Sequence, residues 1–239
     1  MKKTKIKLIM PVLGDFDHGL MDYLDGIKEP DTELTLAKVK GGVDAIESYY
    51  DASIAAPYIL KEVESAGREG FEAVTIFCGT DPIIHAAKEI SSIPMVGILE
   101  AAIHIACVLG RRFSLLTILP ETVGSKYDKL GEMGMMERCA SVISLGIPAL
   151  ELEKDPVRLM QVLVEKANLA IGRDGADTLI LTCVGLFHMA DPLSNKVKIP
   201  VLDPTACGVK WCEMFARMKF CQSRHAYPSP REKKRTLPM

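Results

Sequence analysis

Short apolar runs recur along the chain at intervals that are too long for hairpins. They have the length and the β-branched content of strands, and they cover residues 5–12, 33–39, 73–78, 94–98, 112–117, 141–148, 178–183 and 200–203. Between most of them the apolar residues recur with a helical period, as in residues 42–67, 100–109, 157–172 and 205–219. Strands that are apolar throughout and alternate with helices predict an α/β fold, with mainly parallel sheets covered by helices on both faces.

An internal repeat refines this prediction. The stretch GFEAVTIFC (70–78) is similar to GADTLILTC (175–183): a glycine opens each one and a cysteine closes it. In each half a later strand then opens with an Ile-Pro pair, at Pro94 and at Pro200. Two copies with so long a period do not make a solenoid. We therefore expect two pseudo-symmetric α/β lobes that face each other across a cleft, with the active site in that cleft.

The repeat also suggests where the chain divides. We assign residues 1–98 and 206–239 to the first lobe, the latter as a C-terminal helix and tail, and residues 99–205 to the second lobe. The segment 224–239 is rich in proline and basic residues, so we expect a surface tail that is partly disordered at its end. The short apolar run near the N-terminus lacks the features of a secretion signal and is interpreted as the first strand.

Composition excludes several classes of protein. The chain has 239 residues, of which 48% are hydrophobic and 25% charged, and its formal net charge is −2. Without a basic stripe, nucleic acid is not an expected partner. Without an apolar stretch of about 20 residues, neither is a membrane. We expect a cytoplasmic protein that acts on a small molecule.

Seven cysteines occur, and none forms a Cys-x-x-Cys motif. We therefore expect neither a disulfide framework nor a zinc site, and most of these thiols fit small core positions. The carboxylates Asp15, Asp17 and Asp22 surround His18, but their spacing does not match a calcium loop, so we expect no metal. No glycine-rich phosphate loop is present, and no cofactor is expected.

Cys78 and Cys183 end two equivalent strands, and ligands bind beyond the carboxyl ends of parallel strands. After Cys78 we expect a turn at Gly79, with Asp81 as N-cap and Pro82 as the first helical residue. A second helix is expected to start soon after Cys183. A helix N-terminus lowers the pKa of a thiol from its free value of about 8.5. The alternative is that each cysteine only packs at a strand end, but matching positions in a repeat favour a joint function.

One reaction requires such a pair. Inverting a carbon stereocentre by proton transfer needs a base on one face of the carbon and an acid on the other, and the two exchange roles in the reverse direction. One thiolate and one thiol can do this without a cofactor. The turns that follow the cysteines are placed to stabilise the enolate-like state.

At this point the sequence resembles the aspartate/glutamate racemase superfamily, and most of all the hydantoin racemases. The similarity lies in the order and spacing of residues 48–82, 93–102, 110–117, 138–153, 183–193 and 223–230. It implies a cofactor-independent racemase that forms a homo-oligomer and uses Cys78 and Cys183 as proton acid and base. It also implies substrate contacts from Pro11, Val12, Gly79, Thr80, Thr117, Val184 and Gly185.

The sequence departs from the family where the first strand ends. There the family commonly has Asn-Pro-Asn-Thr, whose asparagines contact substrate, whereas this chain has the apolar stretch 10–13. The change favours a 5-monosubstituted hydantoin, or a relative such as allantoin, over a free amino acid. The alternatives are an aspartate or glutamate racemase, a lyase or isomerase of the arylmalonate decarboxylase or maleate isomerase type, and a binding protein whose cysteines only pack.

Four other polar residues follow the predicted strands. His85 and His188 come shortly after the two cysteines, and we expect both to face solvent rather than hold a thiolate. Glu100 and Asp203 follow the two Ile-Pro strands, and we expect both to cap the helices that come next.

Overall fold

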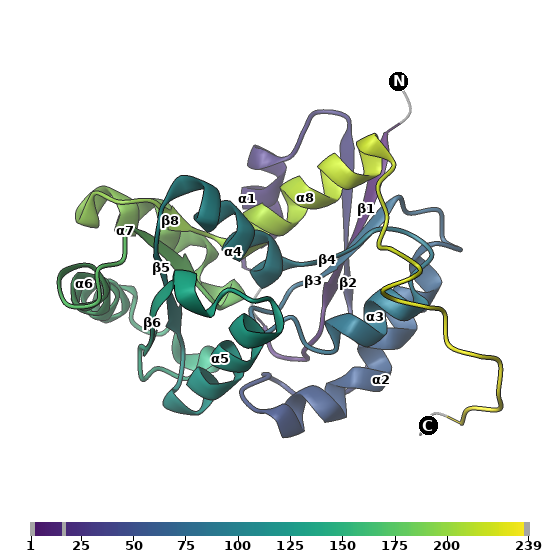
Figure 1. Cartoon of the computed structure of the whole chain (residues 1–239), viewed down its shortest axis with the longest axis horizontal. Helices are drawn as coiled ribbons and strands as arrows, with labels where there is room; N and C mark the ends of the chain where they lie inside the picture. Colours follow the sequence, from purple (N-terminus) through teal and green to yellow (C-terminus); the bar gives the residue numbers. More distant parts are fainter. Residues whose placement is uncertain (1–2, 16–17, 237–239) are drawn as a thin grey trace.

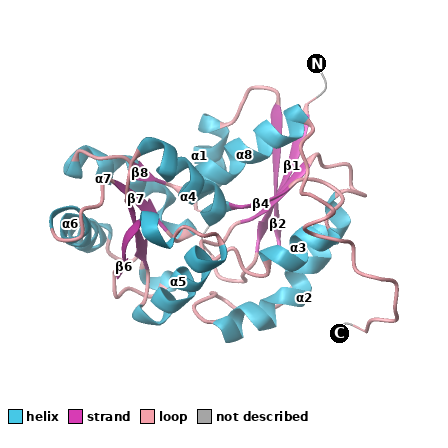
Figure 2. Ribbon diagram, in the orientation of Figure 1, coloured by secondary structure: helices cyan, strands magenta, loops and turns pink. Residues whose placement is uncertain are grey.

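The computed structural model describes residues 3–15 and 18–236. It contains two four-stranded sheets, both entirely parallel and both flanked by helices (Figure 2). The first sheet has the order β2-β1-β3-β4, formed by β1 (Thr4–Met10), β2 (Thr32–Lys38), β3 (Ala73–Ile76) and β4 (Met95–Gly97). The second has the order β6-β5-β7-β8, formed by β5 (Phe113–Thr117), β6 (Cys139–Ser144), β7 (Thr178–Leu181) and β8 (Val201–Leu202). The predicted α/β fold with two similar lobes is confirmed.

The central strands are buried along their length because helices cover both faces of each sheet. Every residue of β3, β5 and β7 is buried, which explains why these strands read as continuous apolar runs instead of alternating ones. β3 pairs with the central strand β1, and β7 pairs in the same way with β5. The two cysteines that follow β3 and β7 therefore occupy equivalent places.

Eight helices surround the sheets in the described part of the chain. They are α1 (Leu20–Ile27), α2 (Tyr49–Ala66), α3 (Ile84–Ile90), α4 (Ile98–Leu109), α5 (Val123–Glu132), α6 (Pro156–Gly172), α7 (Ala190–Val197) and α8 (Pro204–Met218). The long ones start where the sequence supplies a cap: the side chains of Ser48 and Asp155 accept backbone N–H groups at the starts of α2 and α6. Helix α2 packs on the first sheet, and α6 packs on the second.

Helices α4 and α8 each cross to the opposite lobe. α4 follows β4 of the first sheet but packs on β5 and β7, and α8 follows β8 of the second sheet but packs on β1, β3 and β4. The two helices lie against each other between the sheets (Figure 1). Gly208 permits this approach, since a Cβ atom there would lie 2.6 Å from Cγ2 of Ile98. The proposed division of the chain at residues 98/99 and 205/206 stays a prediction, and this exchange supports it.

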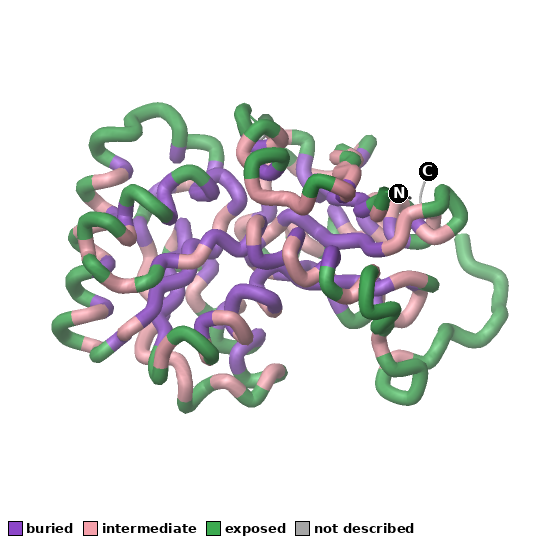
Figure 3. The backbone as a smooth tube through the Cα atoms, turned by 90° about the horizontal axis from the view of Figure 1, so that it is seen from above, coloured by how far each residue is buried: buried purple, intermediate pink, exposed green. Residues whose placement is uncertain are grey.

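The C-terminal tail runs over the outside of the first lobe, near α3 (Figure 1). The Arg224 guanidinium donates to the carbonyl oxygens of Lys88 and Glu89, and the Tyr227 ring stacks on His85. The predicted surface tail is thus confirmed as far as residue 236, and its end lies outside the described residues. Buried residues form one continuous band through both lobes, while the tail and the outer helix faces are exposed (Figure 3). Within residues 3–15 and 18–236, no helix combines the length and the apolar character needed to cross a bilayer.

Candidate active site

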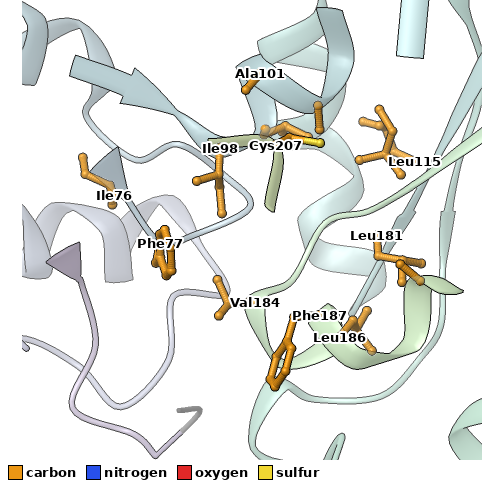
Figure 4. Packing of buried hydrophobic residues seen from close by; sticks show 14 of the residues in the cluster. Ile76, Phe77, Ile98, Ala101, Leu115, Leu181, Val184, Leu186, Phe187 and Cys207 are labelled. Carbon is orange, nitrogen blue, oxygen red and sulfur yellow. The ribbon is translucent and has the colours of Figure 1, made fainter. Parts of the chain in front are cut away.

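The two cysteine turns meet between the lobes. Cys78 follows β3 and Cys183 follows β7, each at the carboxyl end of its strand. A Cβ atom placed on Gly79 would lie 1.9 Å from the carbonyl oxygen of Thr182, so the two turns are in backbone contact. Only glycine allows this approach. The residues beside the cysteines, Phe77 and Val184, belong to the apolar core that the lobes share (Figure 4).

One cavity of about 50 Å³ lies at this meeting point. Both cysteines line it, together with every residue predicted to contact substrate: Pro11, Val12, Gly79, Thr80, Thr117, Val184 and Gly185. A larger groove of about 520 Å³ adjoins the cavity, since Ile46, Thr80 and Thr122 line both. The structure therefore brings the predicted residues together, and their individual roles stay predictions.

The Cys78 sulfur has several groups around it that favour a thiolate. The Thr80 hydroxyl lies 3.2 Å from Sγ, and the backbone N–H of Thr80 donates to the same sulfur. Burial raises the pKa of Cys78, while both Thr80 groups and the Lys126 ammonium lower it and the Asp81 carboxylate raises it. Protein dipoles and one cation thus replace part of the water that this sulfur loses.

The Cys183 sulfur has less support. The backbone N–H of Gly185 donates to it and Lys126 attracts its negative charge, but Cys78 and Glu47 both repel that charge. Burial dominates, and it raises the pKa of Cys183 to about 12. At neutral pH this cysteine is therefore a thiol, which can donate a proton.

Lys126 is a cavity residue that the sequence analysis missed. It lies on α5 of the second lobe, is 1% exposed, and donates from Nζ to the carbonyl oxygen of Gly79 at 2.8 Å. The signal was present in the pattern of α5, where Lys126 occupies the same helical stripe as Val123, Leu130 and Met133. A lysine inside an apolar stripe is buried among core residues and needs a partner.

The remaining wall is mainly apolar. Met10 and Val12 are 1% and 5% exposed, which agrees with the apolar contacts expected at the end of the first strand. Thr117 also lines the cavity, but its hydroxyl is already bonded to that of Thr122 at 2.6 Å. Because the Thr122 hydroxyl donates to the carbonyl oxygen of Leu119, the Thr117 hydroxyl is the donor in this pair. Toward a ligand, Thr117 can only accept.

The chain after Cys78 differs from the prediction. α3 begins at Ile84 instead of Pro82, because Asp81 and Ile83 have φ angles of +44° and +51°, in the left-handed region. Asp81 is not the N-cap of α3. Its carboxylate instead accepts two backbone N–H groups in the first turn of α4, at 3.0 and 2.8 Å. The expectation that Asp81 caps a helix starting at Pro82 was therefore wrong.

The two predicted helix caps have different outcomes. Asp203 caps α8, since its carboxylate accepts the backbone N–H of Thr205 at 2.9 Å and that of the next residue at 3.0 Å. Glu100 was wrongly assigned as a cap, because Asp81 already takes that role for α4. Glu100 lies within the first turn and pairs with Lys88 at 2.7 Å.

The histidines lie outside the cavity. His188 is exposed, and so is His85, whose Nε2 lies 3.2 Å from the Glu132 carboxylate across the lobes. The prediction that both face solvent is confirmed.

His18 does not belong to a metal cluster in the part of the chain that is described. It contacts the carboxylates of Asp15 and Glu153 at 3.3 and 3.4 Å. Asp17, the central acid of the group considered above, lies outside the described residues. Among the described ones, no group of three or more metal-ligating side chains occurs.

Known proteins agree with this architecture. The model of the Asp/Glu/Hydantoin racemase family matches residues 19–212. A hydantoin racemase of Pseudomonas sp. (strain NS671) is 31% identical over 232 residues, which span 95% of this chain and 93% of the relative.

Two solved structures are also similar over almost their whole length. The allantoin racemase from Klebsiella pneumoniae has a TM-score of 0.93 at 27% identity, covering 98% of this chain and 97% of its own. The allantoin racemase from Pseudomonas fluorescens has a TM-score of 0.90 at 28% identity, covering 98% and 100%. They confirm the predicted fold and enzyme class: the chain belongs to the Asp/Glu/Hydantoin racemase family.

Proposed function

We propose that the chain is a cofactor-independent racemase of 5-monosubstituted hydantoins or of allantoin-like relatives. The observation that carries the proposal is that Cys78 and Cys183, from the two lobes, line one small cavity. The similar hydantoin and allantoin racemases support the substrate class. Both kinds of molecule are cyclic ureides with an acidic C–H next to a carbonyl group, so one site suits either.

The two cysteines take opposite roles in each turnover. Cys78 begins as a thiolate and removes the proton from C5 on one face of the ring. The electron pair of the broken C–H bond delocalises into the neighbouring carbonyl as an enolate. Cys183 begins as a thiol and gives its proton to the opposite face of the same carbon, and the roles exchange in the reverse direction. The raised pKa of Cys183 suits it to the acid role in this direction.

The enolate oxygen requires hydrogen-bond donors that are already in place. We assign this role to the backbone N–H groups of Gly79 and Val184, which open the two turns and line the cavity. The neighbouring N–H groups, of Thr80 and Gly185, already donate to the sulfurs.

The charge of the wall favours a neutral ring over a free amino acid. Among the described residues that line the cavity, Lys126 carries the charge and no carboxylate is present. The ammonium group of an amino acid would enter beside a cation without an anionic partner, which costs free energy in a buried site. A hydantoin ring is neutral when it binds and anionic as the enolate, so the Lys126 ammonium stabilises the enolate.

The test is racemisation and solvent deuterium incorporation with each enantiomer of a hydantoin panel, allantoin, aspartate and glutamate. We expect inversion of the ureides with deuterium at C5, and loss of inversion in Cys78→Ala and in Cys183→Ala. Cys221→Ala is the matched control, since that thiol is exposed and lies away from the cavity. Full racemisation by either cavity variant would refute the two-cysteine mechanism, and turnover of amino acids alone would refute the substrate class.

We further propose a homo-oligomer that acts in the cytoplasm. The end of α4 presents Val108 and Leu109, which are 86% and 53% exposed, an arrangement suited to burial against a second copy. All seven cysteines are free, which fits a reducing compartment.

A further inference from the structure

We infer that Lys126 is a positioning residue for Cys78: its ammonium group reaches across from the other lobe, holds the turn that carries this cysteine and favours the thiolate form of its sulfur. The inference rests on the proposed function, in which Cys78 is the base.

Lys126 connects the two lobes at the Cys78 turn. Lys126 belongs to α5, in the second lobe, and its Nζ donates to the carbonyl oxygen of Gly79 in the first lobe at 2.8 Å. Gly79 is the residue directly after Cys78, so the lysine ties the cysteine turn to the opposite lobe. The side chain is 1% exposed and lines the cavity with both cysteines. A buried ammonium in this place lacks the water that would otherwise stabilise its charge.

Lys126 also lacks a carboxylate counter-ion in the described part of the chain. Within the described residues, no carboxylate lies within ion-pair distance of Lys126, although the other buried lysines, Lys7, Lys88 and Lys129, all have such a partner. The groups whose charge acts on Lys126 are Cys78, Asp81 and Cys183.

Asp81 is a poor partner for Lys126. Its carboxylate is occupied by the N–H groups at the start of α4 and faces Lys129 at 4.0 Å. Burial and the nearby Glu100 carboxylate raise its pKa, while Lys129 and the two N–H groups lower it. Of the three groups whose charge acts on Lys126, the two sulfurs are the ones that line the cavity with it.

The two sulfurs differ in their donors. Cys78 has the hydroxyl and the N–H of Thr80, whereas Cys183 has, among the described residues, only the N–H of Gly185. Each sulfur also faces one carboxylate, that of Asp81 at Cys78 and that of Glu47 at Cys183. Burial lowers the pKa of Lys126 to about 8, so at pH 7 the lysine is still protonated. The Lys126 ammonium therefore lies where it favours negative charge on Cys78, against the burial that raises the pKa of this thiol.

The experiment titrates Cys78 directly, without any substrate. Iodoacetamide alkylation is followed at each pH by peptide mass spectrometry, which separates Cys78 from the other six thiols. In Lys126→Met and Lys126→Gln we expect the alkylation midpoint of Cys78 to rise by about one pH unit or more, because an opposite charge has been removed. Lys126→Arg keeps the charge and restores at least part of the shift. Gln keeps an N–H donor but carries no charge. If the hydrogen bond to the Gly79 carbonyl alone set the pKa of Cys78, the alkylation midpoint of Lys126→Gln would stay at the wild-type value.

Lys129→Met is the matched control, because it removes another buried lysine one turn further along α5 that faces Asp81 instead of the sulfurs. We expect no rise of the Cys78 midpoint in this variant. An unchanged midpoint in folded Lys126→Met and Lys126→Gln, or an equal rise in Lys129→Met, would overturn the inference. If one neutral variant fails to fold, the other decides. Because alkylation needs no substrate, a failure of the proposed racemase activity leaves this result intact and is seen separately in the racemisation assay.

Discussion

The turn after Cys78 and the turn after Cys183 stand on equivalent strands, yet they surround their sulfurs with different chemistry. Cys78 has the hydroxyl and N–H of Thr80 and is followed by the turn Gly79-Thr80-Asp81. Cys183 is followed directly by a short 3-10 helix (Val184–Met189) in which every residue but His188 is buried. The duplicated sheet places the two sulfurs, and the unequal turns give them different numbers of groups that stabilise a thiolate.

This asymmetry matters for a racemase. A symmetric pair would have no preferred resting state, and each sulfur would begin half of the turnovers. With unequal turns, the two sulfurs differ in what stabilises a thiolate: two donor groups of Thr80 lower the pKa of Cys78, while within the described residues the Gly185 N–H alone donates to Cys183. If Cys78 is the base, as proposed, we expect the enantiomer whose proton faces Cys78 to react faster.

The largest effect is expected when deuterium exchange at C5 and inversion of C5 are measured separately in the two cysteine variants. In Cys183→Ala we expect Cys78 still to remove the proton of one enantiomer and to return a deuteron to the same face, while inversion falls by roughly 10²- to 10⁴-fold. In Cys78→Ala we expect both exchange and inversion to fall, since Cys183 stays protonated near neutral pH. Proton NMR in D₂O measures the exchange, and polarimetry measures the inversion.

Cys139→Ala controls for the loss of a half-buried thiol outside the cavity. Equal deuterium exchange in the two cavity variants, each acting on its own enantiomer, would mean that the turns are equivalent in practice and that the asymmetry has no chemical effect.

The placement of the two cysteines was predictable because strand ends follow from local pattern. The apolar runs, the glycines that precede two of them and the repeated Ile-Pro pairs predict strands in both sheets. Parallel strands then bring their carboxyl ends to one edge. The apolar character of the cavity near Val12 was predictable for the same reason. These features depend on residues that are neighbours in sequence.

Lys126 and Asp81 were not predictable in the same way because each acts across a long interval of sequence. Lys126 reaches Gly79 only once the lobes have closed. Asp81 turns away from α3 through a left-handed backbone, and the space for its carboxylate exists because Gly97 has no side chain. A Cβ atom on Gly97 would lie 2.5 Å from Oδ2 of Asp81. Capping rules consider only residues next to the helix start, so they do not predict this contact.

A smaller effect is expected in Thr80→Val, which removes the hydroxyl beside the Cys78 sulfur. A hydrogen bond to a charged group contributes about 1.5–3 kcal/mol, so the pKa of Cys78 should rise by roughly one unit. The thiolate is the active form, and a higher pKa leaves less of it at pH 7. The racemisation rate there should fall about tenfold, and the pH at which the rate levels off should move up by about one unit. A deficit that is the same at every pH would show that Thr80 acts by contact alone.

The smallest effect compares the two buried caps. Asp81 and Asp203 each hold the start of a helix that crosses between lobes, so alanine at either position should cost about 0.5–2 kcal/mol of unfolding free energy in urea titrations. Racemisation should fall only in Asp81→Ala, because Asp81 also fixes the turn of Cys78 while Asp203 lies away from the cavity.

Asp81→Asn distinguishes the hydrogen bonds of Asp81 to α4 from the effect of its negative charge on Cys78. Its amide oxygen can still accept one of the two α4 N–H groups, but the negative charge that raises the pKa of Cys78 is gone. If the hydrogen bonds to α4 dominate, kcat/KM falls in both Asp81 variants at every pH. If repulsion between the carboxylate and the thiolate dominates, the pKa of Cys78 falls in Asp81→Asn and the pH–rate profile of this variant moves to lower pH. We expect the first result, because two N–H groups of α4 and the Lys129 ammonium already offset the charge of Asp81.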